Sequence, residues 1–216
     1  MIPTLLNRSG RSVWFRRTRL LRCASVLLAC GLVGETLGES FLFESATLGQ
    51  TGQVGGVAIS DQVLGARFYV DSPIQVEEVG GHILGRPPAA EGHGTIFAAI
   101  VSLSGPTAFP ADEPGSLDVL AFTTFEAPFP SQDVVVPLSV SLEPGYYGLI
   151  FGGRGLFGCS GEGSMPDNNT EVPGNASFFL WSAGRANAWL NASARGARFV
   201  IKGRTATLAN SDSGPE

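Results

Sequence analysis

Two adjacent acidic residues, Glu77 and Glu78, are the first groups in this sequence that could perform catalysis. Paired carboxylates hydrolyse glycosidic bonds when they face one cavity at a separation of about 5–9 Å. Neighbouring residues of a regular strand point to opposite faces, so only a β-bulge would bring the two together. His82 and His93, the two histidines of the chain, could act beside them as acid and base or bind a metal. Because no H-E-x-x-H or H-x-H spacing occurs, we expect a solvated polar patch and keep a polysaccharide hydrolase or lyase as an alternative.

Oxygen-bearing side chains cluster in one short segment that contains Asp167, Asn168, Asn169 and Glu171. Loops of this composition can bind Ca²⁺. The spacing does not follow the EF-hand pattern, and loops rich in Asp and Asn commonly form turns without any ligand. We therefore expect no metal or other cofactor and keep a Ca²⁺-stabilised adhesion module as a second alternative.

Trp181 and Trp189 are the candidates for contact with a sugar. Exposed aromatic rings on a β-sandwich can stack on sugar rings, whereas buried rings fill the core. Trp189 lies close to an expected turn, so we expect its ring to be exposed.

Cys159 is the single cysteine that remains after the N-terminal segment described below, so no intrachain disulfide is expected in the mature chain. A nucleophilic cysteine needs a neighbouring base and a lowered pKa. The surrounding Gly-rich sequence carries no such signature, and we expect a free thiol that packs as a small apolar side chain.

Alternation of apolar and polar residues with a period of two runs through the chain after residue 38, with Gly, Pro, Asn and Asp at the ends of each run. The clearest strand is Val134–Leu142, in which Pro137 indicates an edge position or a bulge. Thr95–Leu103 is apolar at both parities, which is typical of a central strand. The apolar parity changes between Val76 and Val79, and this change predicts a β-bulge. Further strands are expected at 40–47, 64–70, 74–84, 118–126, 145–152, 176–182 and 196–202.

About nine short strands predict an all-β protein with a single antiparallel β-sandwich or jelly roll. The longest irregular stretches, 85–94, 104–117 and 153–175, should form its rims. We assign the sandwich domain to residues 39–204 and a disordered polar tail to residues 205–216. That tail has no apolar run, so no transmembrane anchor is expected there.

The first 38 residues have the pattern of a secretory signal peptide with a signal helix. Residues 1–22 contain six Arg and no acid, and the apolar run 23–33 is shorter than the roughly 20 residues that span a bilayer. A cut before Glu39 would leave small residues at the cleavage site. A twin-arginine signal at Arg16-Arg17 and a lipoprotein anchored through Cys30 remain alternatives. The sequence thus predicts a protein that is secreted or held in the cell envelope.

The net charge of −5 is the average of two unlike parts. From Glu39 onward the chain has eight basic and eighteen acidic side chains, a net charge of −10. The basic residues of this part form no stripe, so nucleic-acid binding is not expected.

An ordered set of short stretches resembles a group of uncharacterised secreted bacterial β-sandwich proteins, many of which carry a PEP-CTERM sorting tail. The stretches are GARFYV at 65–70, VGGHI at 79–83, GTIFAAIV at 94–101, DVL at 118–120, LEPGYYGLIF at 142–151, GLFG at 155–158 and RFVI at 198–201. The resemblance implies an exported sandwich domain in the envelope or the extracellular matrix. It supplies no catalytic residues, and this chain departs from the pattern because it lacks the sorting tail.

Taken together, these patterns predict a secreted, non-enzymatic β-sandwich that binds or is displayed at the cell exterior. Its expected partner is an extracellular polysaccharide or another cell-surface component. The hydrolase or lyase and the Ca²⁺-stabilised module are the alternatives.

Overall fold

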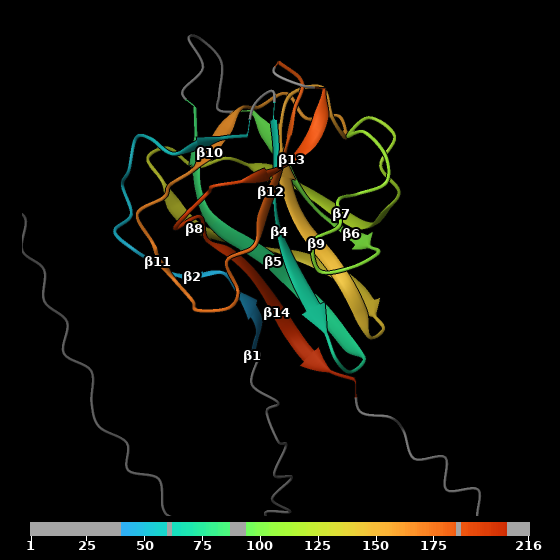
Figure 1. The fold of residues 1–216 in the computed structure, drawn as a ribbon. Helices are drawn as coiled ribbons and strands as arrows, with labels where there is room; N and C mark the ends of the chain where they lie inside the picture. The colour runs from blue at the N-terminus through green and yellow to red at the C-terminus, as the bar shows by residue number, and fades with distance from the viewer. Residues whose placement is uncertain (1–39, 60–61, 87–93, 185–186, 207–216) are drawn as a thin grey trace, which may run out of the picture. The chain divides into compact units, whose positions relative to one another are not determined.

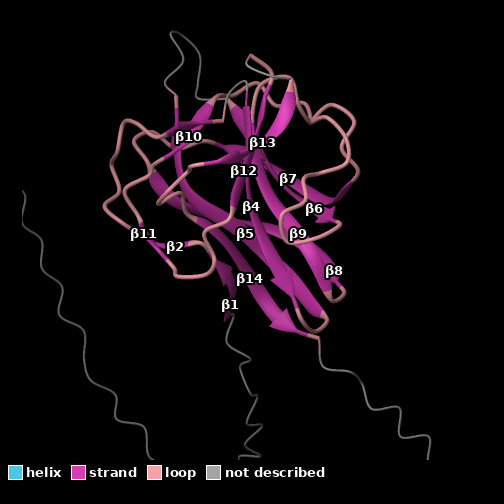
Figure 2. Cartoon of the chain, viewed as in Figure 1, coloured by secondary structure: helices cyan, strands magenta, loops and turns pink. Residues whose placement is uncertain are grey.

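The computed structural model describes residues 40–59, 62–86, 94–184 and 187–206, and all regular elements within them are β-strands (Figures 1 and 2). The all-β prediction is therefore confirmed. No helix in this described part of the chain has the length and apolar character needed to cross a membrane. The predicted signal peptide with its helix, Cys30, His93 and residues 207–216 of the predicted tail lie outside the described residues.

Two six-stranded antiparallel sheets pack against each other as a β-sandwich. The first sheet contains β1 (Ser40–Glu44), β14 (Phe199–Thr205), β5 (Ile74–Gly85), β10 (Gly163–Met165) and β3 (Val57–Ala58) in this order, and β8 (Gln132–Leu142) also pairs with β5. The second sheet has the order β13 (Ala188–Ala192), β12 (Phe178–Ser182), β4 (Gln62–Val70), β9 (Gly145–Gly152), β6 (Thr95–Leu103) and β7 (Val119–Glu126). The short strands β2 (Ala46–Thr47) and β11 (Thr170–Glu171) form a separate pair.

The main core lies between the two sheets and follows from the alternation of side chains along the strands. On β4, Leu64, Ala66 and Phe68 point into this core, whereas Arg67 and Tyr69 lie on the opposite, outer face of the second sheet. The first sheet supplies the facing side, which includes Val76, Val79 and Ile83 of β5 and Phe199 and Ile201 of β14.

A second apolar cluster covers the outer face of the second sheet. This explains why β6 has apolar side chains on both of its faces. Ile96, Ala98 and Ile100 of β6 point into the main core, and the residues between them point into the outer cluster. Residues from the loops after β6 and after β9 pack over this outer side. The predicted position of Thr95–Leu103 inside a sheet is confirmed, because β6 pairs with both β9 and β7.

The predicted β-bulge is present in β5. Against β14, Val76 and Glu78 pair with the adjacent residues Gly203 and Lys202, so Glu77 is the extra residue of β5. Against β8 the register shifts at the same place, where Glu78 lies opposite Pro137 and the extra residue belongs to β8. β8 pairs only with β5 among the described strands, so Pro137 occupies both an edge strand and a bulge, as its missing N–H requires.

The structure contains more elements than the nine strands that we predicted. β3, β10, β11 and β13 were not expected, and they have only two to five residues each. β3 pairs with β10, β11 with β2, and β13 with β12, and β10 also reaches the end of the long strand β5. Strands this short depend on the partner segment and have no pattern of their own in the local sequence. Thr205, which we placed in the tail, is the last residue of β14.

Candidate functional site

The loop between β6 and β7, residues 104–118, lies across the outer face of the second sheet, and we call it the strap. Three side chains of the sheet attach to it. The Arg67 Nε donates to the carbonyl of Ala108 at 2.8 Å, and the Trp189 Nε1 donates to the carbonyl of Asp112 at 2.8 Å. The ring of Phe109 in the strap contacts that of Phe179 edge-on, with 6.5 Å between centroids. These contacts hold the strap against β4, β12 and β13.

Phe179 is the centre of the aromatic row beneath the strap. Its ring lies over Gly65 and Gly148, where a Cβ atom on either glycine would collide with it. Trp189 meets Phe179 edge-to-face at 5.5 Å between centroids, and Trp181 meets Trp189 in the same way at 5.4 Å. Such edge contacts are the favoured geometry of aromatic pairs. The rings of Phe179, Trp189 and Trp181 therefore pack in this order along the outer face of the second sheet.

The guanidinium of Arg67 continues this row toward the opposite end of the sheet. It lies between the rings of Phe109 and Phe179, at 5.0 Å and 4.8 Å from their centroids. Its five N–H groups donate to neutral oxygens only, the carbonyls of residues 107, 108 and 178 and the side chains of Ser177 and Asn191. Burial lowers the pKa of this guanidinium from its usual value.

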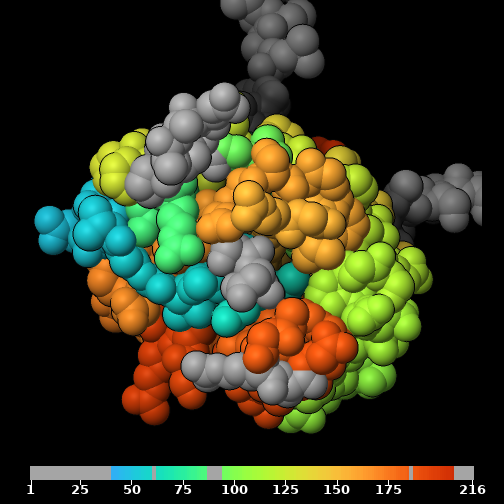
Figure 3. All heavy atoms as spheres, turned by 90° about the horizontal axis from the view of Figure 1, so that it is seen from above, coloured from blue at the N-terminus to red at the C-terminus, as the bar shows by residue number. Residues whose placement is uncertain are grey.

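A pocket of about 410 Å³ opens at the tryptophan end of the row. Trp181 lines it together with Glu113 of the strap, Arg154 of the loop after β9, and Asn187, the residue before β13. Figure 3 shows the strap in green, the 153–160 loop in orange and the residues of β12 and β13 in red-orange at this end of the sandwich. A half-buried indole flanked by a carboxylate, a guanidinium and an amide combines a stacking surface with hydrogen-bonding groups for hydroxyls.

A second opening of about 300 Å³ lies at the other end of the strap, beside Pro106. Its wall includes Arg67, Ser177 and the rings of Tyr69 and Tyr146, whose centroids are 4.8 Å apart. Tyr69 is 59% exposed.

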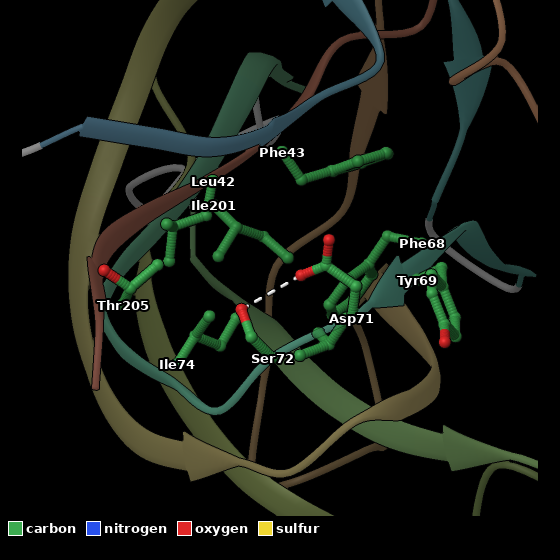
Figure 4. A pocket seen from close by; sticks show the side chains of 10 residues that line it. Leu42, Phe43, Phe68, Tyr69, Asp71, Ser72, Ile74, Ile201 and Thr205 are labelled. Atoms are coloured by element: carbon green, nitrogen blue, oxygen red, sulfur yellow. Dashed lines mark hydrogen bonds between the residues drawn. The ribbon is translucent and has the colours of Figure 1, made fainter. Parts of the chain in front are cut away.

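A smaller pocket of about 130 Å³ adjoins this second opening and shares Phe43, Phe68 and Tyr69 with it. Figure 4 shows Phe43 across the smaller pocket from Asp71 and Ser72, whose hydroxyl donates to the Asp71 carboxylate at 3.0 Å. The ring of Tyr69 lies at the side, directed away from Ile201 and Thr205.

The paired acids do not form a site with a histidine in the described part of the chain. Glu77 pairs with Arg204 at 3.3 Å, and Glu78 pairs with Lys202 at 3.1 Å. His82, the candidate acid or base, is 0% exposed. The arrangement is that of a charged patch on the first sheet, and the geometry gives the hydrolase alternative no support.

His82 instead joins Ser131 and Asn169 in a buried hydrogen-bond network. Its Nε2 lies 2.8 Å from the Ser131 Oγ, and its Nδ1 lies 2.9 Å from the Asn169 Oδ1. The Asn169 amide donates to the carbonyls of Pro166 and Gly196, which identifies Oδ1 as the acceptor. The His82 Nδ1 therefore carries the proton, and the Ser131 hydroxyl donates to Nε2.

This order of groups matches that of a serine hydrolase triad, but the serine is inaccessible. Ser131 is 1% exposed, and its Oγ also accepts the backbone N–H of Gln53 at 2.8 Å. The network fastens the segment that contains Gly49 and Gln53 to the outer side of the first sheet. Its role is structural.

The oxygen-rich segment is likewise engaged in polar contacts within the fold. Asn169 belongs to the network above, the Asn168 Nδ2 donates to the carbonyl of Gln50 at 2.8 Å, and the Glu171 Oε1 accepts the N–H of Gly196 at 3.2 Å. No group of three or more His, Cys, Asp or Glu residues suited to hold a metal occurs among the described residues. The Ca²⁺ alternative stays a prediction for Asp167 and its neighbours.

Trp181 and Trp189 lie together, but the expectation that Trp189 would be exposed is wrong. Its ring is half-buried against Phe179 and Trp181, and its N–H is bound to the strap. Trp181 is the tryptophan that lines the pocket. Cys159 is buried, as expected, and burial raises the pKa of its thiol while a hydrogen bond with Thr95 opposes the shift. The thiol is thus protonated and shielded at neutral pH.

The sequence reasoning missed the second opening with Arg67, Tyr69 and Tyr146. A signal was present, because Arg67 is the one charged residue of β4 and lies within the largely apolar run Val63–Val70. Compared with known proteins, the chain matches no family model and no curated protein.

Proposed function

We propose that the protein is a secreted, non-enzymatic β-sandwich module that binds an extracellular polysaccharide through the pocket of Trp181. The observation that supports the proposal most strongly is the half-buried Trp181 ring in the wall of an open pocket with Glu113, Arg154 and Asn187. An aromatic face holds the apolar side of a sugar ring, and the polar side chains orient its hydroxyls.

The contacts of Trp181 and Arg154 favour ligand binding by this site. The Trp181 ring packs edge-on against Trp189, and the exposed Arg154 guanidinium pairs with Glu162 at 3.3 Å at the rim of the pocket. Preorganised side chains lose little entropy when a ligand binds. Export is supported by the signal-like sequence of residues 1–38. The acidic net charge of residues 39–216 is compatible with an extracellular protein.

Trp181→Ala should abolish most of the retention of this protein on a polysaccharide that the wild type binds. Loss of a central tryptophan from a binding site costs about 2 kcal/mol or more, and this corresponds to a roughly thirtyfold increase in Kd. The measurement is affinity electrophoresis against a panel of soluble polysaccharides, followed by titration calorimetry with the best one.

Phe41→Ala is the matched control, because Phe41 is an exposed ring on the first sheet, where it lies near Arg198 and Lys202. This variant should keep wild-type affinity. Equal affinity of Trp181→Ala and wild type, or no retention of the wild type by any polysaccharide, would contradict the proposal.

A further inference from the structure

The charge of Arg67 is buried without a counter-charge. The residue is 7% exposed, and none of the carboxylates in the described part of the chain contacts its guanidinium. A buried cation is normally paired, because neutral acceptors recover only part of the solvation that it loses. The contrast with Arg198 is direct, since that buried guanidinium contacts the carboxylates of both Glu44 and Asp133.

The uncompensated charge lies at the wall of the second opening. The terminal nitrogens of Arg67 bind the Ser177 Oγ at 3.5 Å and the carbonyl of Thr107, the residue after Pro106, at 3.4 Å. Ser177, Pro106 and Arg67 all line the pocket of about 300 Å³. These two hydrogen bonds are the longest that the guanidinium makes, so a stronger acceptor entering the pocket could replace them.

The other walls of the pocket suit a sugar ring. Tyr69 and Tyr146 form a pair of exposed or half-exposed rings, and Asn175 and Ser177 add an amide and a hydroxyl. The Ser177 hydroxyl accepts from Arg67, so its own proton can be donated to a ligand. Asp71 lies in the wall of the smaller adjoining pocket and not of this one.

We propose that this second pocket binds the carboxylate of a uronic acid residue, and that the polysaccharide partner is therefore an acidic one. The inference rests on the proposed function and names its ligand class. The carboxylate would supply the counter-charge that Arg67 lacks, while the tyrosine pair holds the sugar ring. From Glu39 onward the chain has a net charge of −10, so a preference for an acidic ligand requires a local cation such as this one.

The test compares trigalacturonic acid with its methyl ester, using titration calorimetry on the full chain. The acid should bind about tenfold more tightly than the ester, the usual order for one charge-assisted contact. Ser177→Asp places a carboxylate beside Arg67 and should remove this preference. Ser177→Asn has a similar size without the charge and should retain it. Pairing with Arg67 should also raise the melting temperature of Ser177→Asp, so a folding failure is not expected.

Equal affinity for acid and ester, or equal binding of the acid by Ser177→Asp and Ser177→Asn, would overturn the inference. If Trp181-dependent retention on a neutral polysaccharide persisted in that case, the proposed function would stand without it. If neither uronate binding nor Trp181-dependent retention were observed, both the uronic acid inference and the proposed function would be overturned.

Discussion

Asn169→Ala should lower the free energy of unfolding by about 4 kcal/mol, because four buried or partly buried groups would lose their partner at once. The Asn169 Oδ1 accepts from the Gly49 N–H at 2.9 Å and from the His82 Nδ1 at 2.9 Å. Its Nδ2 donates to the carbonyl of Pro166 at 3.0 Å and to that of Gly196 at 2.6 Å. Leaving a buried polar group unpaired costs about 1–3 kcal/mol.

Urea unfolding followed by circular dichroism measures this loss. Asn168→Ala is the neighbouring control, since the Asn168 side chain is exposed and makes a single bond to the Gln50 carbonyl. That variant should lose less than about 1 kcal/mol. An Asn169→Ala protein as stable as Asn168→Ala would show that the His82 network does not hold this part of the fold.

Gly80→Ala should destabilise the sandwich by about 3 kcal/mol, near the upper range for an overpacked interior. Gly80 lies in the middle of β5, between β14 and β8, and a Cβ atom there would collide with the carbonyl oxygen of Val134. Because the obstacle is backbone, relief requires β8 to move away from β5. That movement would weaken the ladder along the most extensively paired strand of the first sheet.

Thermal unfolding compares this variant with Gly105→Ala in the strap. A Cβ atom on Gly105 would meet nothing within 4 Å, so its replacement should leave the melting temperature nearly unchanged. Similar melting temperatures for the two variants would contradict the close approach of β8 to β5 at Gly80.

The long strands could be predicted from the sequence because local pattern and burial agree in them. Thr95–Leu103 was predicted with its observed bounds, and the Pro137 edge position and the β5 bulge are confirmed. β13 was missed because its five residues, including Trp189, have no period-two pattern of their own. It pairs only with β12, and the strap covers its tryptophan, so tertiary contacts decide its structure.

The candidate site was predicted only in part, for a related reason. Trp181 and Trp189 were both named as candidates for sugar contact, but their mutual contact was not predicted. Which ring faces the pocket depends on the strap, and the path of the strap has no periodic pattern in the sequence. His82 was considered as a catalytic group, and its burial depends on Ser131 and Asn169, which lie 49 and 87 residues away in the chain. Hydrogen-bond partners so far apart in the chain cannot be recognised from the sequence around His82.

The two pockets at the ends of the strap suggest how one polysaccharide chain would be held. A fixed row of side chains, from Trp181 through Phe179 to Arg67, connects them beneath the strap. Two subsites joined by this row raise affinity because the second contact is intramolecular once the first has formed. Glu77 and Glu78 line neither pocket, so their ion pairs with Arg204 and Lys202 would remain when a polysaccharide binds.

The indole N–H signals of the tryptophans test the central claim most directly. Trp181 and Trp189 are the only tryptophans after residue 38, so a protein that begins at Glu39 should show two such signals, which Trp181→Phe assigns. On titration with a retained polysaccharide, the Trp181 signal should shift markedly. The Trp189 signal should move less, because its N–H is already bound to the Asp112 carbonyl. If neither signal moved at a polysaccharide concentration that saturates retention, the pocket of Trp181 would not be the binding site.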